Sequence, residues 1–144
     1  MLGREPLDGA TAKQINPVTL AFLGDAAYSL YVRETLVCAG GGKPADFQRT
    51  ASKAVSARGQ SEFLERVLPL LTEEETEIFR RGRNAKKPTK SKHASPAEYN
   101  RSTGFEAVLG YLYITGKQDR LELLMRTATE NALALTPAQT PYKP

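Results

Sequence analysis

The chain has 144 residues, of which 40% are hydrophobic and 25% are charged, as is typical of one soluble globular domain. Its one histidine and one cysteine exclude a Cys/His zinc site and an internal disulfide bond. The sequence shows no secretory leader and no membrane-spanning run, so we expect a cytoplasmic protein. If it is an enzyme, its chemistry should depend on carboxylates and a hard metal ion.

The first half of the chain is predicted to be helical. Asn16 is a candidate N-cap with Pro17 at the first helical position, and this helix is expected to run to about Cys38. The glycines of "AGGGKP" should end it. Residues 45–71 are typical of one or two amphipathic helices, and a break is expected near Gly59.

The second half is predicted to be helical on either side of one loop. Thr72 to Glu75 fits a capping box that opens a short helix, and Asn100 or Ser102 is a candidate cap for a helix ending at Ile114. A last helix is predicted after it, and no strand pattern appears, so the expected fold class is all-α. We interpret residues 1–144 as a single domain with a core at about 16–134, a flexible basic loop at about 84–100 and a frayed tail at about 136–144.

Positive charge is concentrated in one segment. Residues 80–101 carry eight Lys or Arg and one acid, a net charge of +7, whereas the rest of the chain carries 12 basic and 15 acidic residues. The Gly, Pro and Ser content of this segment predicts a loop. Two interpretations remain open: a solvated loop kept extended by its own repulsion, or a loop that binds phosphates.

Two acidic residues lie in otherwise apolar helices. Asp25 is surrounded by apolar and small residues in "LAFLGDAAY", and Glu106 is the only charged residue of "STGFEAVLGYLYITG". Gly24 and Gly110 would let the two helix backbones approach closely. We therefore expect the two carboxylates to converge on one small polar pocket.

A buried carboxylate requires a cationic neighbour, a raised pKa or a bound metal. One interpretation is structural: Asp25 pairs with Arg33 or Arg101, and Glu106 pairs with Arg101. The other is a Mg²⁺ site, in which water and substrate phosphates complete the coordination that two carboxylates begin. Composition and spacing alone do not decide between them.

The two acidic helices are similar to those of a known family. "LAFLGDAAYSLYVRETL" and "STGFEAVLGYLYITG", with acids about eighty residues apart, resemble the signature helices of ribonuclease III. "RRGRNAK" resembles the short Mini-III branch in particular, and the resemblance covers about residues 16–130. It implies a helical, homodimeric ribonuclease III-like domain that cleaves double-stranded RNA with Mg²⁺ and leaves short 3′ overhangs. It also implies 23S rRNA precursors in a pre-50S ribosomal particle as the natural substrate.

The resemblance assigns roles residue by residue. Asp25 and Glu106 match two metal ligands of the family, so both are expected to be catalytic. Ala21 and Thr103 stand where the full-length family has a glutamate and an aspartate, and Thr103 is a candidate holder of a metal-bound water. Since the Mini-III branch has no double-stranded RNA-binding domain, the basic segment is expected to contact phosphates through Arg83, Lys86, Lys87, Lys90 and Lys92.

Three functions follow from these observations. The favoured one is a metal-dependent endoribonuclease specific for double strands. The second is a catalytically silent RNA-binding relative that acts in ribosome assembly, for which the missing acids argue. The third is a helical interaction protein without an RNA role, against which the +7 segment and the paired motifs argue.

Overall fold

The computed structural model describes residues 3–40, 42–87 and 94–130, except for the side chains of Arg58 and Ser61. Within these ranges the chain has helices and no strand, which confirms the all-α expectation. In chain order the helices are α1 (Gly9–Lys13), α2 (Pro17–Ala39), α3 (Pro44–Val55), α4 (Ala57–Val67), the 3₁₀ turn η1 (Leu68–Leu70), α5 (Glu73–Asn84), α6 (Pro96–Ile114) and α7 (Gln118–Thr129).

Most helix ends follow local sequence signals. The side chain of Asn16 accepts a hydrogen bond from the backbone N–H of Val18 at 2.8 Å, which confirms the predicted cap of α2. That helix ends at Ala39, where Gly40 takes a positive φ of 70°. Thr72 and Glu75 form the predicted capping box of α5.

Two helix boundaries differ from the prediction. The break between α3 and α4 is at Ser56 instead of Gly59, because the extended Ser56 caps α4 by accepting from the N–H of Gly59 at 3.0 Å. Asn100 and Ser102 are not caps, because the helix begins earlier: Ser95, five residues before Asn100, is the N-cap and forms a capping box with Glu98. As a result, α6 includes the last residues of the segment that we expected to be a loop.

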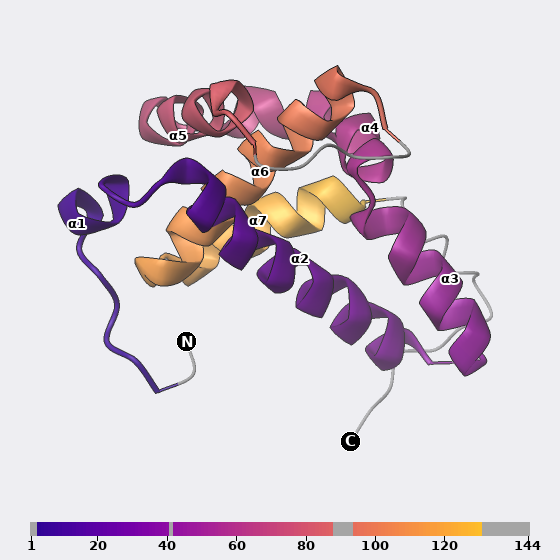
Figure 1. Ribbon diagram of the computed structural model, residues 1–144. Coiled ribbons are helices and arrows are strands. Elements are labelled where there is room, and N and C mark those ends of the chain that lie inside the picture. The colour runs from indigo at the N-terminus through magenta and orange to yellow at the C-terminus, as the bar shows by residue number, and fades with distance from the viewer. Residues whose placement is uncertain (1–2, 41, 88–93, 131–144) are drawn as a thin grey trace.

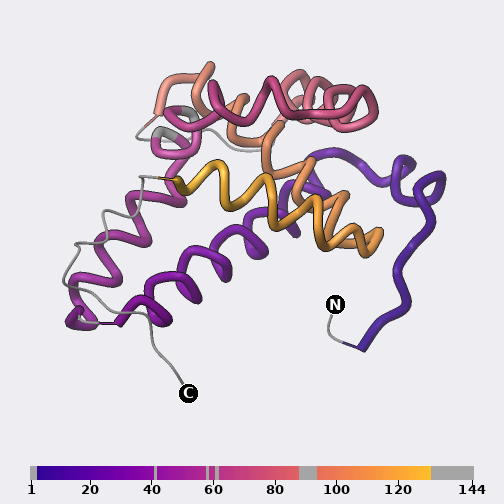
Figure 2. The backbone as a smooth tube through the Cα atoms, turned by 180° about the vertical axis from the view of Figure 1, so that it is seen from behind, coloured from indigo at the N-terminus to yellow at the C-terminus, as the bar shows by residue number. Residues whose placement is uncertain are grey.

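Helix α6 lies at the centre of the fold, as Figures 1 and 2 show, and it packs against α2, α4, α5 and α7. Its buried residues join those of α2 in the main core, which explains why α6 is apolar on most sides and why the inner side of α2 is apolar. Neither of them, nor any other helix in the described ranges, is long and apolar enough to cross a membrane.

Glycines set how closely the neighbours of α6 approach it. A Cβ on Gly24 would lie 1.8 Å from the Glu106 carbonyl oxygen, and one on Gly110 would lie 1.9 Å from that of Leu20. These distances are shorter than any real contact, so only glycine allows α2 and α6 to cross at this separation. The close approach expected from Gly24 and Gly110 is confirmed.

The crossing of α5 and α6 uses a second pair of glycines. A Cβ on Gly82 would lie 2.9 Å from the Cα of Gly104 and 3.1 Å from the carbonyl oxygen of Thr103. The C-terminal end of α5, where the basic segment begins, therefore contacts α6 one helical turn before Glu106.

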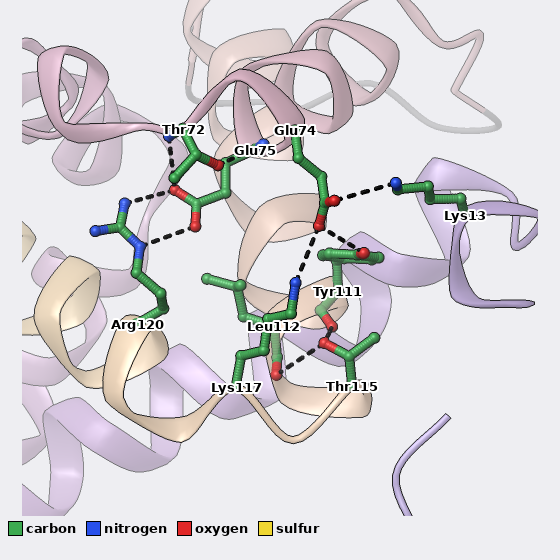
Figure 3. Close-up of polar contacts among 9 residues, drawn as sticks. All are labelled: Lys13, Thr72, Glu74, Glu75, Tyr111, Leu112, Thr115, Lys117 and Arg120. Carbon is green, nitrogen blue, oxygen red and sulfur yellow. Dashed lines mark hydrogen bonds and ion pairs between the residues drawn. The ribbon is translucent and has the colours of Figure 1, made fainter. Parts of the chain in front are cut away.

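An ionic network fastens α5 to its neighbours on the side shown in Figure 3. Glu75 is 3% exposed and accepts two hydrogen bonds from the Arg120 guanidinium, at 2.6 and 2.9 Å. Glu74 accepts from the Tyr111 hydroxyl at 2.7 Å and pairs with Lys117 and Lys13 at 3.1 Å. These bonds, led by that of Tyr111, lower the pKa of Glu74 to about 2 and connect α5 with α1, α6 and α7.

Candidate active site

The glycine crossing brings the two predicted acidic residues together. Asp25 directly follows Gly24, and Gly24 packs so closely on the backbone of Glu106 that any side chain there would collide with it. Glu106 is partly buried, whereas Asp25 is exposed. Our expectation that Asp25 is buried in an apolar environment is therefore wrong: the outer side of α2 is uncovered in the monomer, and Asp25 lies on it beside Phe22.

The electrostatic consequences of this convergence fall on Glu106. Its pKa is raised to about 9, first by burial and then by the neighbouring carboxylate of Asp25. A hydrogen bond from Gln60 Nε2 to Glu106 Oε2, at 3.3 Å, acts in the opposite direction. Two ionised carboxylates would repel each other here, and a bound cation would relieve that repulsion.

The structural salt bridges considered for these acids do not form. Arg101 donates to Glu65 at 2.7 Å, and Arg33 donates to the Ser29 hydroxyl one turn away on α2. Among the described residues neither arginine pairs with Asp25 or Glu106. The structure therefore contradicts the interpretation of both acids as partners of these arginines.

A buried glutamine, missed in the sequence, completes the described surroundings of Glu106. Gln60 is 2% exposed and lies in the first turn of α4. The signal was present, because Gln60, Leu64 and Val67 share the spacing of a buried helix face and only the first is polar. The Tyr28 hydroxyl is also buried, and its pKa is raised chiefly by that burial and in part by the charge of Glu106.

The two residues that stand where the full-length family has an acid are both buried. Ala21 is 6% exposed and Thr103 is 5% exposed. The Thr103 hydroxyl donates to the Tyr99 carbonyl oxygen at 2.9 Å, so its proton is used within α6 and only its lone pairs are left for a water. In the described part of the chain, no three His, Cys, Asp or Glu residues gather as metal ligands.

The donor set fits a hard divalent cation. It consists of oxygens from two carboxylates that destabilise each other when both are ionised, and Mg²⁺ is commonly held by one or two carboxylates together with waters and phosphates. If Mg²⁺ occupies the site, Asp25 and Glu106 would hold it, and Asp25 offers the more accessible oxygens.

The predicted phosphate-binding residues lie at the C-terminal end of α5 and beyond it. Arg83 and Lys86 are exposed, with the Arg83 guanidinium 5.9 Å from the centre of the Phe79 ring. Lys87 donates to the carbonyl oxygens of Gly82 and Arg83, both at 2.8 Å, so it caps α5. Lys90 and Lys92 lie outside the described residues.

Comparison with known proteins identifies the class to which this site belongs. The family model described as Ribonuclease III domain matches residues 18–117, a stretch that contains both carboxylates. A crystal structure of a protein from Fusobacterium nucleatum, 24% identical in sequence, shares the fold with a TM-score of 0.73. That similarity covers 83% of this chain and 95% of the other.

Relatives with higher identity narrow the assignment. A Mini-ribonuclease 3 from Symbiobacterium thermophilum is 46% identical over 79% of this chain and 88% of its own length. One from Streptococcus pneumoniae is 47% identical over 77% of this chain and 88% of its own length. The chain belongs to the Mini-ribonuclease 3 branch of the ribonuclease III family, and it is a ribonuclease of that family.

We predict that Glu106→Gln changes how stability depends on pH in the metal-free protein. Unfolded Glu106 ionises near pH 4.5, whereas the folded protein keeps its proton up to about pH 9. The folded state then binds more protons in this window, so wild-type stability falls as pH rises through it. The stability of the variant relative to wild type should increase from pH 5 to pH 9, by at most about 1.4 kcal/mol per pH unit.

Urea denaturation in EDTA measures this difference. Glu34→Gln, which changes an exposed carboxylate of α2, is the control and should show no trend with pH over the same window. A difference for Glu106→Gln that is flat with pH would contradict the assignment of a raised pKa to this residue.

Proposed function

We propose that this protein is a Mg²⁺-dependent endoribonuclease that cleaves double-stranded RNA, with 23S rRNA precursors in the large ribosomal subunit as its natural substrate. The observation that carries the proposal is the convergence of Asp25 and Glu106 at the α2–α6 crossing, without a basic partner among the described residues. Membership of the Mini-ribonuclease 3 branch supports the substrate class.

Each carboxylate has a distinct role in this proposal. Asp25 is exposed, so its oxygens can meet a metal and an RNA phosphate from the solvent side, while Glu106 holds the same ion from the interior. Bound Mg²⁺ would supply an activated water and stabilise negative charge on the phosphodiester that is hydrolysed. Thr103 could support a metal-bound water only as a hydrogen-bond acceptor, because its proton is donated to Tyr99.

The basic end of α5 would direct RNA toward the carboxylates. It packs against α6 at Thr103, one helical turn from Glu106. Phosphate contacts supply affinity for duplex RNA without sequence preference. Arg83 and Lys86 are the best placed of the described candidates, whereas Lys87 would have to release two carbonyl oxygens first.

We also propose that the protein is a homodimer, with a second copy covering the outer side of α2. Phe22, Leu30 and Val37 are 83%, 62% and 63% exposed. Their spacing of eight and seven residues places them on one helical face. This face is continuous with Asp25, so the partner would border each metal site.

A catalytically silent relative is the second candidate function. The observation that favours it is the small carboxylate set: Ala21 and Thr103 are buried and offer no carboxylate oxygen. Such a protein would bind duplex RNA and leave it intact.

The central prediction is that Asp25→Asn abolishes cleavage and preserves RNA binding. The substitution keeps the shape of the side chain and removes the charge that holds the metal, so the cleavage rate should fall at least ~100-fold, as for removal of a main electrostatic contributor to catalysis. The assay compares a long RNA duplex incubated with Mg²⁺ or with EDTA, and Glu34→Gln on the same helix should cleave as wild type does.

Wild-type protein that binds duplex RNA but does not cut it with Mg²⁺ would reject the enzyme in favour of the silent relative. Failure to bind duplex RNA at low salt would reject both the enzyme and the silent RNA-binding relative. It would favour a helical interaction protein without an RNA role.

Changing Arg83 and Lys86 together to alanine is expected to weaken duplex binding and to flatten its salt dependence. Each lost phosphate contact should reduce the slope of log K against log salt by about one. Filter binding at several salt concentrations in EDTA measures the slope. The control is the exposed pair Arg4, in the segment before α1, and Arg126, on α7. An unchanged slope would show that the basic segment does not contact phosphates.

Phe22→Asp is expected to convert a dimer into a monomer, because it replaces the most exposed apolar side chain of the proposed interface with a charge. Sedimentation velocity measures the change, and Leu70→Asp, at an exposed apolar residue on η1, should leave the dimer intact. A wild-type protein that sediments as a monomer at micromolar concentration would overturn the homodimer.

A further inference from the structure

Gln60 forms a hydrogen-bond bridge between three helices. Its Nε2 donates to the Val55 carbonyl oxygen at 2.9 Å and to Glu106 Oε2 at 3.3 Å. A primary amide has two N–H donors, and both are used here. Because both partners are acceptors, the amide nitrogen must face them, and the orientation of the side chain is fixed.

The chain break before α4 explains why Gln60 can reach both partners. Val55 is the last residue of α3, so no backbone N–H of that helix can donate to its carbonyl oxygen. Ser56 then turns the chain and caps α4, and Gly59 avoids a side chain that would lie 2.2 Å from the Lys53 carbonyl oxygen. Gln60 follows directly and is directed inward, toward α6.

A purely structural role does not account for a glutamine at this position. The Gln60 Oε1 atom is buried and has no hydrogen-bond partner among the described residues. An unpaired buried acceptor is destabilising, and an apolar side chain of similar size would avoid that cost. The useful part of the amide is therefore its nitrogen, which donates hydrogen bonds. Of the two acceptors of this nitrogen, Val55 lies at the α3–α4 junction and Glu106 lies on α6.

We propose that Gln60 is a positioning residue of the metal site, which holds Glu106 Oε2 so that the other carboxylate oxygen faces the cation. This inference rests on the proposed metal-dependent function. Hydrogen bonds to a ligating carboxylate orient it and commonly change metal affinity 10- to 100-fold when they are removed. The need is greater here, because Ala21 and Thr103 supply no carboxylate and the described residues bring two carboxylates together to hold the ion.

The test is metal binding by Gln60→Met in the absence of RNA. Methionine preserves the length and the apolar stem of the side chain and removes both donors. Binding of Mn²⁺, measured by electron paramagnetic resonance, should weaken at least 10-fold, and high Mn²⁺ should restore cleavage. Binding of duplex RNA in EDTA should stay within twofold of wild type, because Gln60 is buried and its side chain is not exposed to an RNA phosphate.

Ser56→Ala is the matched control. It removes the cap of the same helix and lowers stability, but it leaves the contact between Gln60 and Glu106 in place. Mn²⁺ affinity in this variant should equal that of wild type. If Gln60→Met weakens Mn²⁺ binding no more than Ser56→Ala does, Gln60 is only structural and the inference is wrong.

A measurement on the wild-type protein covers the case in which Gln60→Met does not fold. In a ¹H–¹⁵N NMR spectrum the side-chain amide of Gln60 should shift as Mg²⁺ is added, whereas that of the exposed Gln48 on α3 should not. An unmoved Gln60 signal at saturating Mg²⁺ overturns the inference alone. Wild-type protein that binds neither metal overturns the proposed function and this inference together.

Discussion

The contact on which the candidate site depends is the crossing of α2 and α6 at Gly24 and Gly110. Each glycine faces the backbone of the other helix, at a distance where one additional carbon atom would overlap a carbonyl oxygen. The crossing places the residue after Gly24 next to Glu106, so two acids about eighty residues apart in sequence share one site.

Buried Glu75 and partly buried Glu106 are treated in opposite ways by the structure. Glu75 is enclosed by an arginine fork and a capping box, so its charge is fully compensated and it stabilises the scaffold. Glu106 accepts from one amide and faces a second carboxylate, so its ionised form has no compensating partner and is disfavoured. Uncompensated charge reduces stability, and proteins retain it where a ligand supplies the missing partner. The contrast separates an acid whose charge is compensated within the scaffold from the acid that we propose as a metal ligand.

The same central helix organises the rest of the site. Helix α6 carries Glu106 on one side and receives the basic end of α5 on another, through the contact of Gly82 with Gly104. Helix α4 adds Gln60 from a third direction. The ionic network of Glu74 and Glu75 holds α5 against α6 and α7, so the basic residues begin from a fixed position relative to the carboxylates.

The sequence by itself determined the all-α class, the caps at Asn16 and Thr72, the two acidic helices and their close approach, because local hydrogen bonding and the absence of a Cβ are properties of single residues. It misplaced the break at Ser56 and the start of α6, where several candidate caps compete. Only the tertiary structure decided that Asp25 is exposed, that Arg33 and Arg101 pair elsewhere, and that Gln60 reaches Glu106. Burial and partnership depend on which helix faces are covered, and that is set by packing between segments distant in the chain.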